Sequence, residues 1–275
     1  MFCRRVLPFL AAGVVLAGLA SAADASAAGP PQRDLTVMSF NIHHGGGTDG
    51  VVDLDRIASV VRANHVDVVA MQEVDRHYSA RSGWADEPAE LAKALDYHVV
   101  FAANIDQDPP APGKPRVQYG TAILSRYPIV HWSNTLLFRS PDQEQRGLLR
   151  ADIEVQSVRV SVFDTHLEAY STIDRQTQAL QVADLVADAR PSILMGDLNA
   201  EPDAPELQPL FGALTDAWPA AGTGPELTYP AEGPVKRIDY VLTGPGAQPR
   251  QCTVVTTNPV ASDHLPMACQ VTVSR

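Results

Sequence analysis

A carboxylate and a carboxamide two residues apart follow a short apolar run late in the chain. The run is Ile193-Leu-Met195, and Gly196 separates it from Asp197 and Asn199. The apolar residues predict a buried strand, and the glycine predicts a backbone turn at its end. Because residues two apart on an extended chain share a face, both polar side chains should point the same way. Such a pair could bind a phosphate or a metal-held water, although an ordinary turn uses the same residue types.

Polar residues recur at the ends of other predicted strands. They are Asn41, Glu73, His166, Asp263 and His264. Loops at one edge of a rigid sheet usually carry the chemistry of a protein. A lone Glu or His after a strand is more often solvated or structural than catalytic. Recurrence on separate strand ends favours a shared site.

Alternating strand and helix patterns must position these side chains. Apolar runs predict strands over residues 35–40, 66–71, 97–102, 121–124, 129–138, 148–155, 158–165, 193–195, 237–242, 252–257 and 267–273. Helical periodicity predicts helices after Asp53 and over residues 88–95, 171–190 and 207–211. The third of these should bury Ile173 and Leu180. These patterns indicate an α/β or α+β protein.

The N-terminal residues have the pattern of an export signal. Two arginines precede the apolar run Val6–Leu19, and small residues follow to Ala28. This pattern predicts a secretory signal over residues 1–27, with cleavage after Ala22 or Ala27. The apolar run is shorter than the ~20 residues of a membrane span, so stable membrane insertion is not expected.

The rest of the chain is acidic and is expected to form one domain. The net charge of the full chain is −11, which argues against passive coating of nucleic acid or anionic membranes. A cleft with a bound cation could still take a polyanion. Residues 34–275 contain no linker or repeat and fit a single large domain. In an exported chain, Cys252 and Cys269 predict a disulfide between neighbouring strands, with two buried free thiols as the alternative.

Seven short motifs together resemble those of a known family. In chain order they are Ser39-Phe-Asn41, Gln72-Glu73, Tyr119-Gly-Thr-Ala122, Thr165-His166-Leu167, Gly196-Asp197-Leu-Asn199, Arg237-Ile-Asp239-Tyr240 and Ser262-Asp263-His264. The set resembles the endonuclease/exonuclease/phosphatase superfamily, which includes deoxyribonuclease I, apurinic endonucleases, neutral sphingomyelinases and inositol polyphosphate phosphatases. The resemblance implies an α/β (α+β) fold, a single-domain four-layer sandwich in which two mixed β-sheets pack face to face with helices outside.

The resemblance also implies a divalent metal ion in the site. Mg²⁺ is the simplest candidate, and Mn²⁺ and Ca²⁺ are alternatives. Glu73 and Asn41 are the expected ligands, and Asp263 would assist directly or through water. The ion would neutralise charge on the phosphoryl oxygens and on the leaving group.

Acid–base roles are implied for the remaining motif residues. His264 is the main candidate, with Asp239 fixing its tautomer. The family resemblance allows two mechanisms. In the first, His264 activates the attacking water. In the second, His264 binds the phosphoryl oxygen while Asp197 orients or deprotonates the water. Asn199 should stabilise the developing oxyanion, and His166 should contact the phosphate or protonate the leaving oxygen.

Other residues near the motifs allow more than one interpretation. Tyr119 is expected to shape the site. His43 stands where some nucleases of the family carry an acidic residue, and it would either bind a second or different metal or pack against its loop. Arg146 and Arg150 could bind a substrate phosphate or form ion pairs at strand ends.

These residues together predict a secreted, monomeric, metal-dependent phosphoesterase. The expected activity is that of a phosphodiesterase on nucleic acid or phospholipid head groups. A phosphomonoesterase for inositol or sugar phosphates is one alternative, and a non-catalytic binding module on the same fold is another. A binding module would be expected to lose the Glu, the Asp-x-Asn or the Asp-His motif, and the chain keeps all three.

Overall fold

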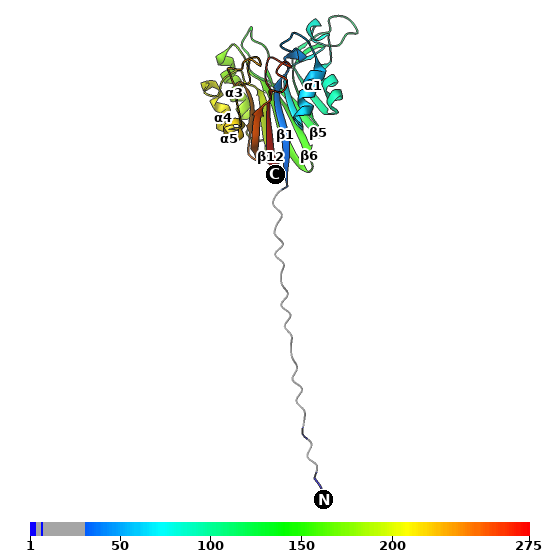
Figure 1. Cartoon of the computed structure of the whole chain (residues 1–275), viewed down its shortest axis with the longest axis vertical. Coiled ribbons are helices and arrows are strands. Elements are labelled where there is room, and N and C mark those ends of the chain that lie inside the picture. The colour runs from blue at the N-terminus through cyan, green and yellow to red at the C-terminus, as the bar shows by residue number, and fades with distance from the viewer. Residues whose placement is uncertain (4–6, 8–30) are drawn as a thin grey trace.

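The computed structural model describes residues 1–3, 7 and 31–275, which include two β-sheets packed face to face (Figure 1). Apart from residues 1–3 and 7, the predicted export signal lies outside the described residues. Among the described residues, no helix is both long enough and apolar enough to cross a bilayer.

Each sheet has six strands and contains both parallel and antiparallel pairs. In spatial order the first sheet consists of β11 (Ala247–Val254), β12 (Met267–Ser274), β1 (Gln32–Asn41), β2 (Val68–Arg76), β4 (Val117–Ser125) and β3 (His98–Gln107). The second consists of β5 (Ile129–Leu136), β6 (Gly147–Val155), β7 (Val158–His166), β8 (Ser192–Asp197), β10 (Asp239–Thr243) and β9 (Thr215–Asp216).

Helices cover the outer faces of both sheets. The first sheet carries α1 (Leu54–Ala63) and α2 (Glu87–Leu95), and the second carries α3 (Thr172–Val186) and α4 (Gln208–Ala213). A short helix, α5 (Ala217–Ala221), packs against the core between the sheets. The 3₁₀ helices are η1 (His43–Gly45), η2 (Ala80–Ser82) and η3 (Pro205–Leu207). The predicted four-layer α/β sandwich is therefore confirmed (Figure 1).

Side chains of β1 show how a central strand becomes buried on both faces. Leu35 and Val37 point into the core between the sheets, whereas Met38 and Phe40 join the outer core under α1 and α2. Successive side chains of a strand point to opposite faces. A strand with both faces covered therefore has a nearly continuous apolar run, as the sequence has here.

Helix α3 begins as predicted but buries a different face. The side chain of Ser171 accepts the backbone N–H of Asp174 and caps the helix. The predicted core residues Ile173 and Leu180 are 74% and 50% exposed, so the predicted face is wrong. Gln178 lies on the buried face, where its side chain donates to the carbonyl of residue 138 and accepts the N–H of residue 168. Ala179, Val182 and Val186 are buried on the same face, so polar contacts and apolar packing both orient the helix.

The predicted disulfide is present. Cys252 of β11 and Cys269 of β12 lie directly opposite each other, and their sulfur atoms are bonded within the core between the sheets. The alternative of two free thiols is therefore excluded. The bridge closes a loop that contains Asp263 and His264.

Candidate active site

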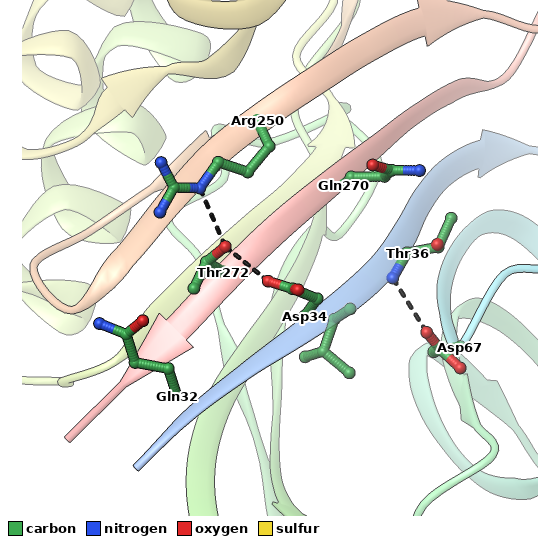
Figure 2. A pocket seen from close by; sticks show the side chains of 8 residues that line it. Gln32, Asp34, Thr36, Asp67, Arg250, Gln270 and Thr272 are labelled. Carbon is green, nitrogen blue, oxygen red and sulfur yellow. Dashed lines mark hydrogen bonds between the residues drawn. The ribbon is translucent and has the colours of Figure 1, made fainter. Parts of the chain in front are cut away.

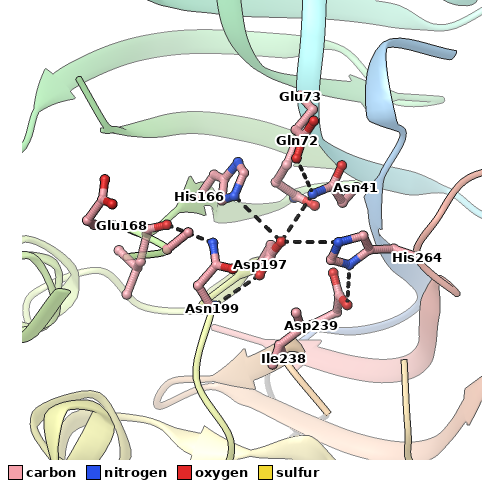
Figure 3. A network of polar contacts seen from close by, with 12 residues as sticks. Asn41, Gln72, Glu73, His166, Glu168, Asp197, Asn199, Ile238, Asp239 and His264 are labelled. Carbon is pink, nitrogen blue, oxygen red and sulfur yellow. Dashed lines mark hydrogen bonds and ion pairs between the residues drawn. The ribbon is translucent and has the colours of Figure 1, made fainter. Parts of the chain in front are cut away.

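Strand register brings the predicted polar residues to one end of the sandwich. In the first sheet β1 and β2 run parallel, with Asn41 opposite Gln72. In the second sheet β7 and β8 run parallel, with His166 opposite Asp197. Strand β10 runs antiparallel to β8 and starts at Asp239, which also lies opposite Asp197. Both sheets therefore present polar side chains at the same end (Figure 3).

Gly196 lies within β8, so the turn predicted at this glycine is wrong. A Cβ atom at position 196 would lie only 2.2 Å from the carbonyl oxygen of Thr165 on β7. Glycine is needed because the two backbones approach closely. The chain turns after Asp197 instead: Asn199 has φ 52° and donates its backbone N–H to Asp197 Oδ1 at 2.9 Å. Asparagine tolerates this left-handed conformation.

Asn41 links the two halves of the site (Figure 3). Its Nδ2 donates to Glu73 Oε1 at 3.0 Å and to Asp197 Oδ2 at 3.1 Å. Glu73 does not end its strand, as was predicted, but sits in a β-bulge of β2 with φ 57°. A bulge changes the direction of a side chain. Here the Glu73 carboxylate lies in the site while β2 continues past it.

His264 is held between two carboxylates. Its Nδ1 lies 2.9 Å from Asp239 Oδ2, and its Nε2 lies 3.7 Å from Asp197 Oδ2. Burial on its own lowers the pKa of His264, but Asp239 and Asp197 outweigh burial and raise the pKa to about 10. The imidazole is therefore protonated at neutral pH, and its Nδ1–H donates to Asp239.

His166 is a second imidazole beside Asp197, with Nε2 3.5 Å from Asp197 Oδ2. Burial lowers the pKa of His166 well below its usual value, and the charges of Arg146 and His264 lower it further. Burial also raises the pKa of Asp197 to about 7, against the opposing charge of His264. The site thus combines a neutral imidazole, a protonated imidazole and a carboxylate that titrates near neutral pH.

The site side chains surround a cavity of about 520 Å³. Seven of the nine residues predicted for the site line it: Glu73, Tyr119, His166, Asp197, Asn199, Asp263 and His264. The other two, Asn41 and Asp239, are buried behind the wall and hydrogen-bond to members of it. The structure therefore brings all nine residues together.

Nothing in the sequence marks Tyr229 as a site residue. Its ring centroid lies 4.7 Å from that of His264, and it lines the cavity. It belongs to an irregular segment before β10 that has no strand or helix periodicity.

The two candidate arginines have different surroundings. Arg146 lines the cavity, is buried, and pairs with Glu144 at 2.8 Å. Arg150 pairs with Asp152 at 2.9 Å and does not line the cavity, which confirms the ion-pair alternative for this residue.

Oxygen donors suited to a divalent cation gather beside Glu73. Glu73 and Asp263 line the cavity, and both side chains are partly exposed. Asn41 Oδ1 accepts the backbone N–H of His43 at 3.1 Å and keeps a second lone pair. Carboxylate and amide oxygens are the ligands that Mg²⁺ takes. These residues therefore fit a hard divalent cation.

Asp197, Asp239 and His264 form a buried group whose ligand atoms lie within 4.8 Å of one another. Such a group could bind a metal ion if His264 gave up its proton. Because that proton is held against Asp239, the group is better suited to acid–base chemistry.

We expect the metal-free protein to lose stability as the pH rises from 7 to 9. The pKa of His264 is about 10 in the folded state and 6.5 for an ordinary histidine, so only the folded state keeps the proton. The resulting stability is complete below pH 6.5 and is lost as the pH rises through 10. His264 should contribute at most about 3 kcal/mol to the fall that urea unfolding measures between the two pH values. Asp239→Asn should reduce this fall, and an unchanged fall would contradict the assignment.

A second hollow, of about 530 Å³, lies on the outer face of β1, β11 and β12 (Figure 2). Arg250 Nε donates to Thr272 Oγ1 at 2.9 Å, and Thr272 Oγ1 donates to Asp34 Oδ1 at 2.6 Å. These three side chains hydrogen-bond to one another on an exposed surface of the sheet. None of the predicted site residues lines this hollow.

The two packed mixed sheets define the class of fold, an α/β sandwich, and it contains a cavity lined by carboxylates and imidazoles. A family model described as the Endonuclease/Exonuclease/phosphatase family matches residues 38–264. The chain belongs to this family, which confirms the resemblance of the seven motifs.

Relatives share this fold along most of the chain. The chain is 27% identical to the uncharacterized protein YbhP of Escherichia coli (strain K12), over 87% of the chain and 97% of YbhP. An endonuclease/exonuclease/phosphatase structure from Beutenbergia cavernae is 29% identical with a TM-score of 0.71, covering 88% of this chain and 72% of that one. The mannosyl-6-phosphatase of Bacteroides thetaiotaomicron is 19% identical with a TM-score of 0.70, covering 86% of this chain and 99% of that one. This last likeness shows the fold alone.

Proposed function

We propose that the chain is an exported, Mg²⁺-dependent phosphodiesterase. The observation that carries the proposal is the convergence of side chains from both sheets on one cavity, joined through Asn41. Membership of the family supports hydrolysis of a phosphoester. Nucleic acids and phospholipid head groups are the leading substrate classes.

Glu73, Asn41 and Asp263 would hold the cation. When bound, it supplies positive charge that neutralises the phosphoryl oxygens and the leaving group. Such local charge matters because the chain carries a net charge of −11 and would otherwise repel an anionic substrate.

The charge states of His264 and Asp197 favour one version of the mechanism. A pKa of about 10 keeps His264 protonated, so its Nε2–H is a donor for a phosphoryl oxygen. A pKa of about 7 leaves Asp197 partly ionised and able to orient a water and accept its proton. In this version Asp197 is the base, and His264 binds the charge that develops on the phosphoryl group.

His166 and Asn199 would complete the contacts to the phosphate. The neutral ring of His166 donates a hydrogen bond more readily than it transfers a proton, which favours contact with the phosphate. Asn199 uses one side-chain N–H on the carbonyl oxygen of Leu167 at 2.9 Å. The other N–H remains for a developing oxyanion.

The Cys252–Cys269 bridge supports the export part of the proposal, because disulfides persist in oxidising compartments. The predicted signal over residues 1–27 would supply the route. N-terminal sequencing of protein recovered outside the cells tests this part, since a chain that begins at Met1 would contradict it.

The purified mature protein should hydrolyse at least one phosphodiester in Mg²⁺. The panel consists of plasmid DNA, RNA, sphingomyelin, lysophospholipid and inositol phosphates. EDTA should abolish the activity and excess Mg²⁺ should restore it, because the cation neutralises the charge on the phosphoryl group. An Asp197→Asn preparation, made in parallel, controls for contaminating enzymes.

The results of this panel separate the proposal from its rivals. Activity on inositol phosphates alone would identify a phosphomonoesterase. Binding without turnover of any substrate would indicate a non-catalytic module. Full activity in EDTA would exclude the role given to the cation.

A further inference from the structure

Two consecutive histidines follow β1 in an unusual backbone conformation. His43 and His44 form the short helix η1, with φ values of 45° and 48°. Residues other than glycine rarely adopt such values, and the conformation persists where the surrounding structure enforces it, often at functional sites. The backbone of Gly46 packs closely against both histidines. A Cβ atom at position 46 would lie 3.0 Å from the His43 carbonyl oxygen and 3.1 Å from His44 Nε2, so a side chain there would crowd this conformation.

The two imidazoles converge on Glu73. One ring nitrogen of each histidine and one carboxylate oxygen of Glu73 lie within 4.8 Å of one another. His43 Nδ1 lies 3.2 Å from the carbonyl oxygen of Gly46. A carbonyl oxygen can only accept, so Nδ1 carries the proton and Nε2 keeps the lone pair that a metal needs.

His44 is partly buried, and its Nδ1 has no hydrogen-bond partner among the described residues. Arg81, whose positive charge acts on His44, makes a bidentate pair with Asp75 at 2.7 and 3.0 Å. A buried ring nitrogen without a partner is unfavourable unless a ligand occupies it.

The geometry points to a second cation position, formed by His43, His44 and Glu73, for a divalent metal of the zinc type that accepts nitrogen ligands. Imidazoles suit Zn²⁺ and its neighbours, whereas Mg²⁺ prefers oxygen ligands alone. The position shares Glu73 with the proposed Mg²⁺ ligands and lies near a second one, since Asp263 Oδ1 is 3.9 Å from His43 Nδ1. It uses neither Asn41 nor the group around His264. Zinc binding there does not depend on the hydrolytic reaction.

Zinc binding to the metal-free full-length protein tests this inference. Competition with a chromophoric chelator in millimolar Mg²⁺ gives the dissociation constant, and Co²⁺ gives a visible spectrum that reports nitrogen ligands. His43→Asn and His44→Asn should each weaken Zn²⁺ binding by about tenfold or more and alter the Co²⁺ spectrum. Asparagine is chosen because it tolerates positive φ. His65→Asn is the matched control, because His65 is exposed and has φ 51°.

The outcomes separate this inference from the proposed function. Zinc affinity and Co²⁺ spectra unchanged in both variants, or weakened equally in His65→Asn, would overturn the site. Circular dichroism and thermal unfolding identify any variant that fails to fold. If a variant fails, the Co²⁺ spectrum of the unsubstituted protein tests the site instead, and the absence of nitrogen-ligand bands would overturn it. Histidine-dependent zinc binding in a protein that hydrolyses nothing would uphold the inference and contradict the phosphodiesterase.

Discussion

We expect His264→Ala to lower kcat by about 10³-fold or more while the protein keeps its fold. The ring is held at 2.9 Å by Asp239 and faces Asp197 at 3.7 Å, so the substitution removes a protonated donor that is positioned beside Asp197. Its removal also leaves Asp239 without a partner, at a cost to stability of about 1–3 kcal/mol. Rates on the best substrate of the panel, with circular dichroism as the check on folding, measure both effects.

A second histidine–carboxylate pair provides the control for this variant. His131 Nδ1 lies 3.6 Å from Asp152 Oδ2 on the edge of the second sheet, and the His131 side chain is 63% exposed. His131→Ala should leave kcat unchanged because this pair does not line the cavity. The site would be wrong if both variants lost activity equally or if neither did.

Asp197→Asn should lower kcat by about 10²–10⁴-fold. The amide has nearly the size of the carboxylate but cannot accept a proton from water. It also removes one of the three carboxylate charges that raise the pKa of His264 to about 10. An NMR titration of the His264 ring should therefore show a lower pKa in the variant. This second measurement reports on the site without any substrate.

Asp164→Asn is the matched control for Asp197→Asn. Asp164 is a fully buried carboxyl on the neighbouring strand β7, where it accepts a hydrogen bond from Gln72 Nε2 at 2.7 Å. Burial raises the pKa of Asp164 well above its usual value, which favours its uncharged form, and asparagine is an uncharged side chain of nearly the same size. We expect kcat to change by about twofold or less. Wild-type kcat in Asp197→Asn would remove this residue from the mechanism.

Strand and helix patterns predicted an α/β or α+β protein with polar residues at its strand ends, and the resemblance of the ordered motifs predicted the four layers and the full set of site residues. Asn41 and His166 follow apolar runs on strands that run parallel to a neighbour, and parallel strands bring their carboxyl ends to one edge. The ordered motifs linked Asp239 and His264 to each other in the predicted site, and strand or helix periodicity alone does not predict that link. Local pattern sufficed where a residue's position follows from the direction of its strand.

Features that depend on contacts between distant segments could not be predicted. Glu73 reaches the site through a bulge in β2, and Gly196 is required by the backbone of β7. The exposed side of α3 carries Ile173 and Leu180, whereas Gln178 on the buried side contacts residues 138 and 168. Each outcome is set by a neighbour far away in the chain, and a window of sequence does not contain that neighbour.

The pairing of β12 with β1 has a consequence for synthesis of the protein. The first sheet carries Asn41 and Glu73 on early strands, yet β1 gains its second neighbour only when residues 267–274 have been made. Until then β1 presents an open edge, and such edges invite proteases and aggregation. Nascent and prematurely terminated chains that end before residue 264 also lack His264, so they should be both short-lived and inert. We therefore expect this hydrolase to stay inactive until nearly all of its chain has been made.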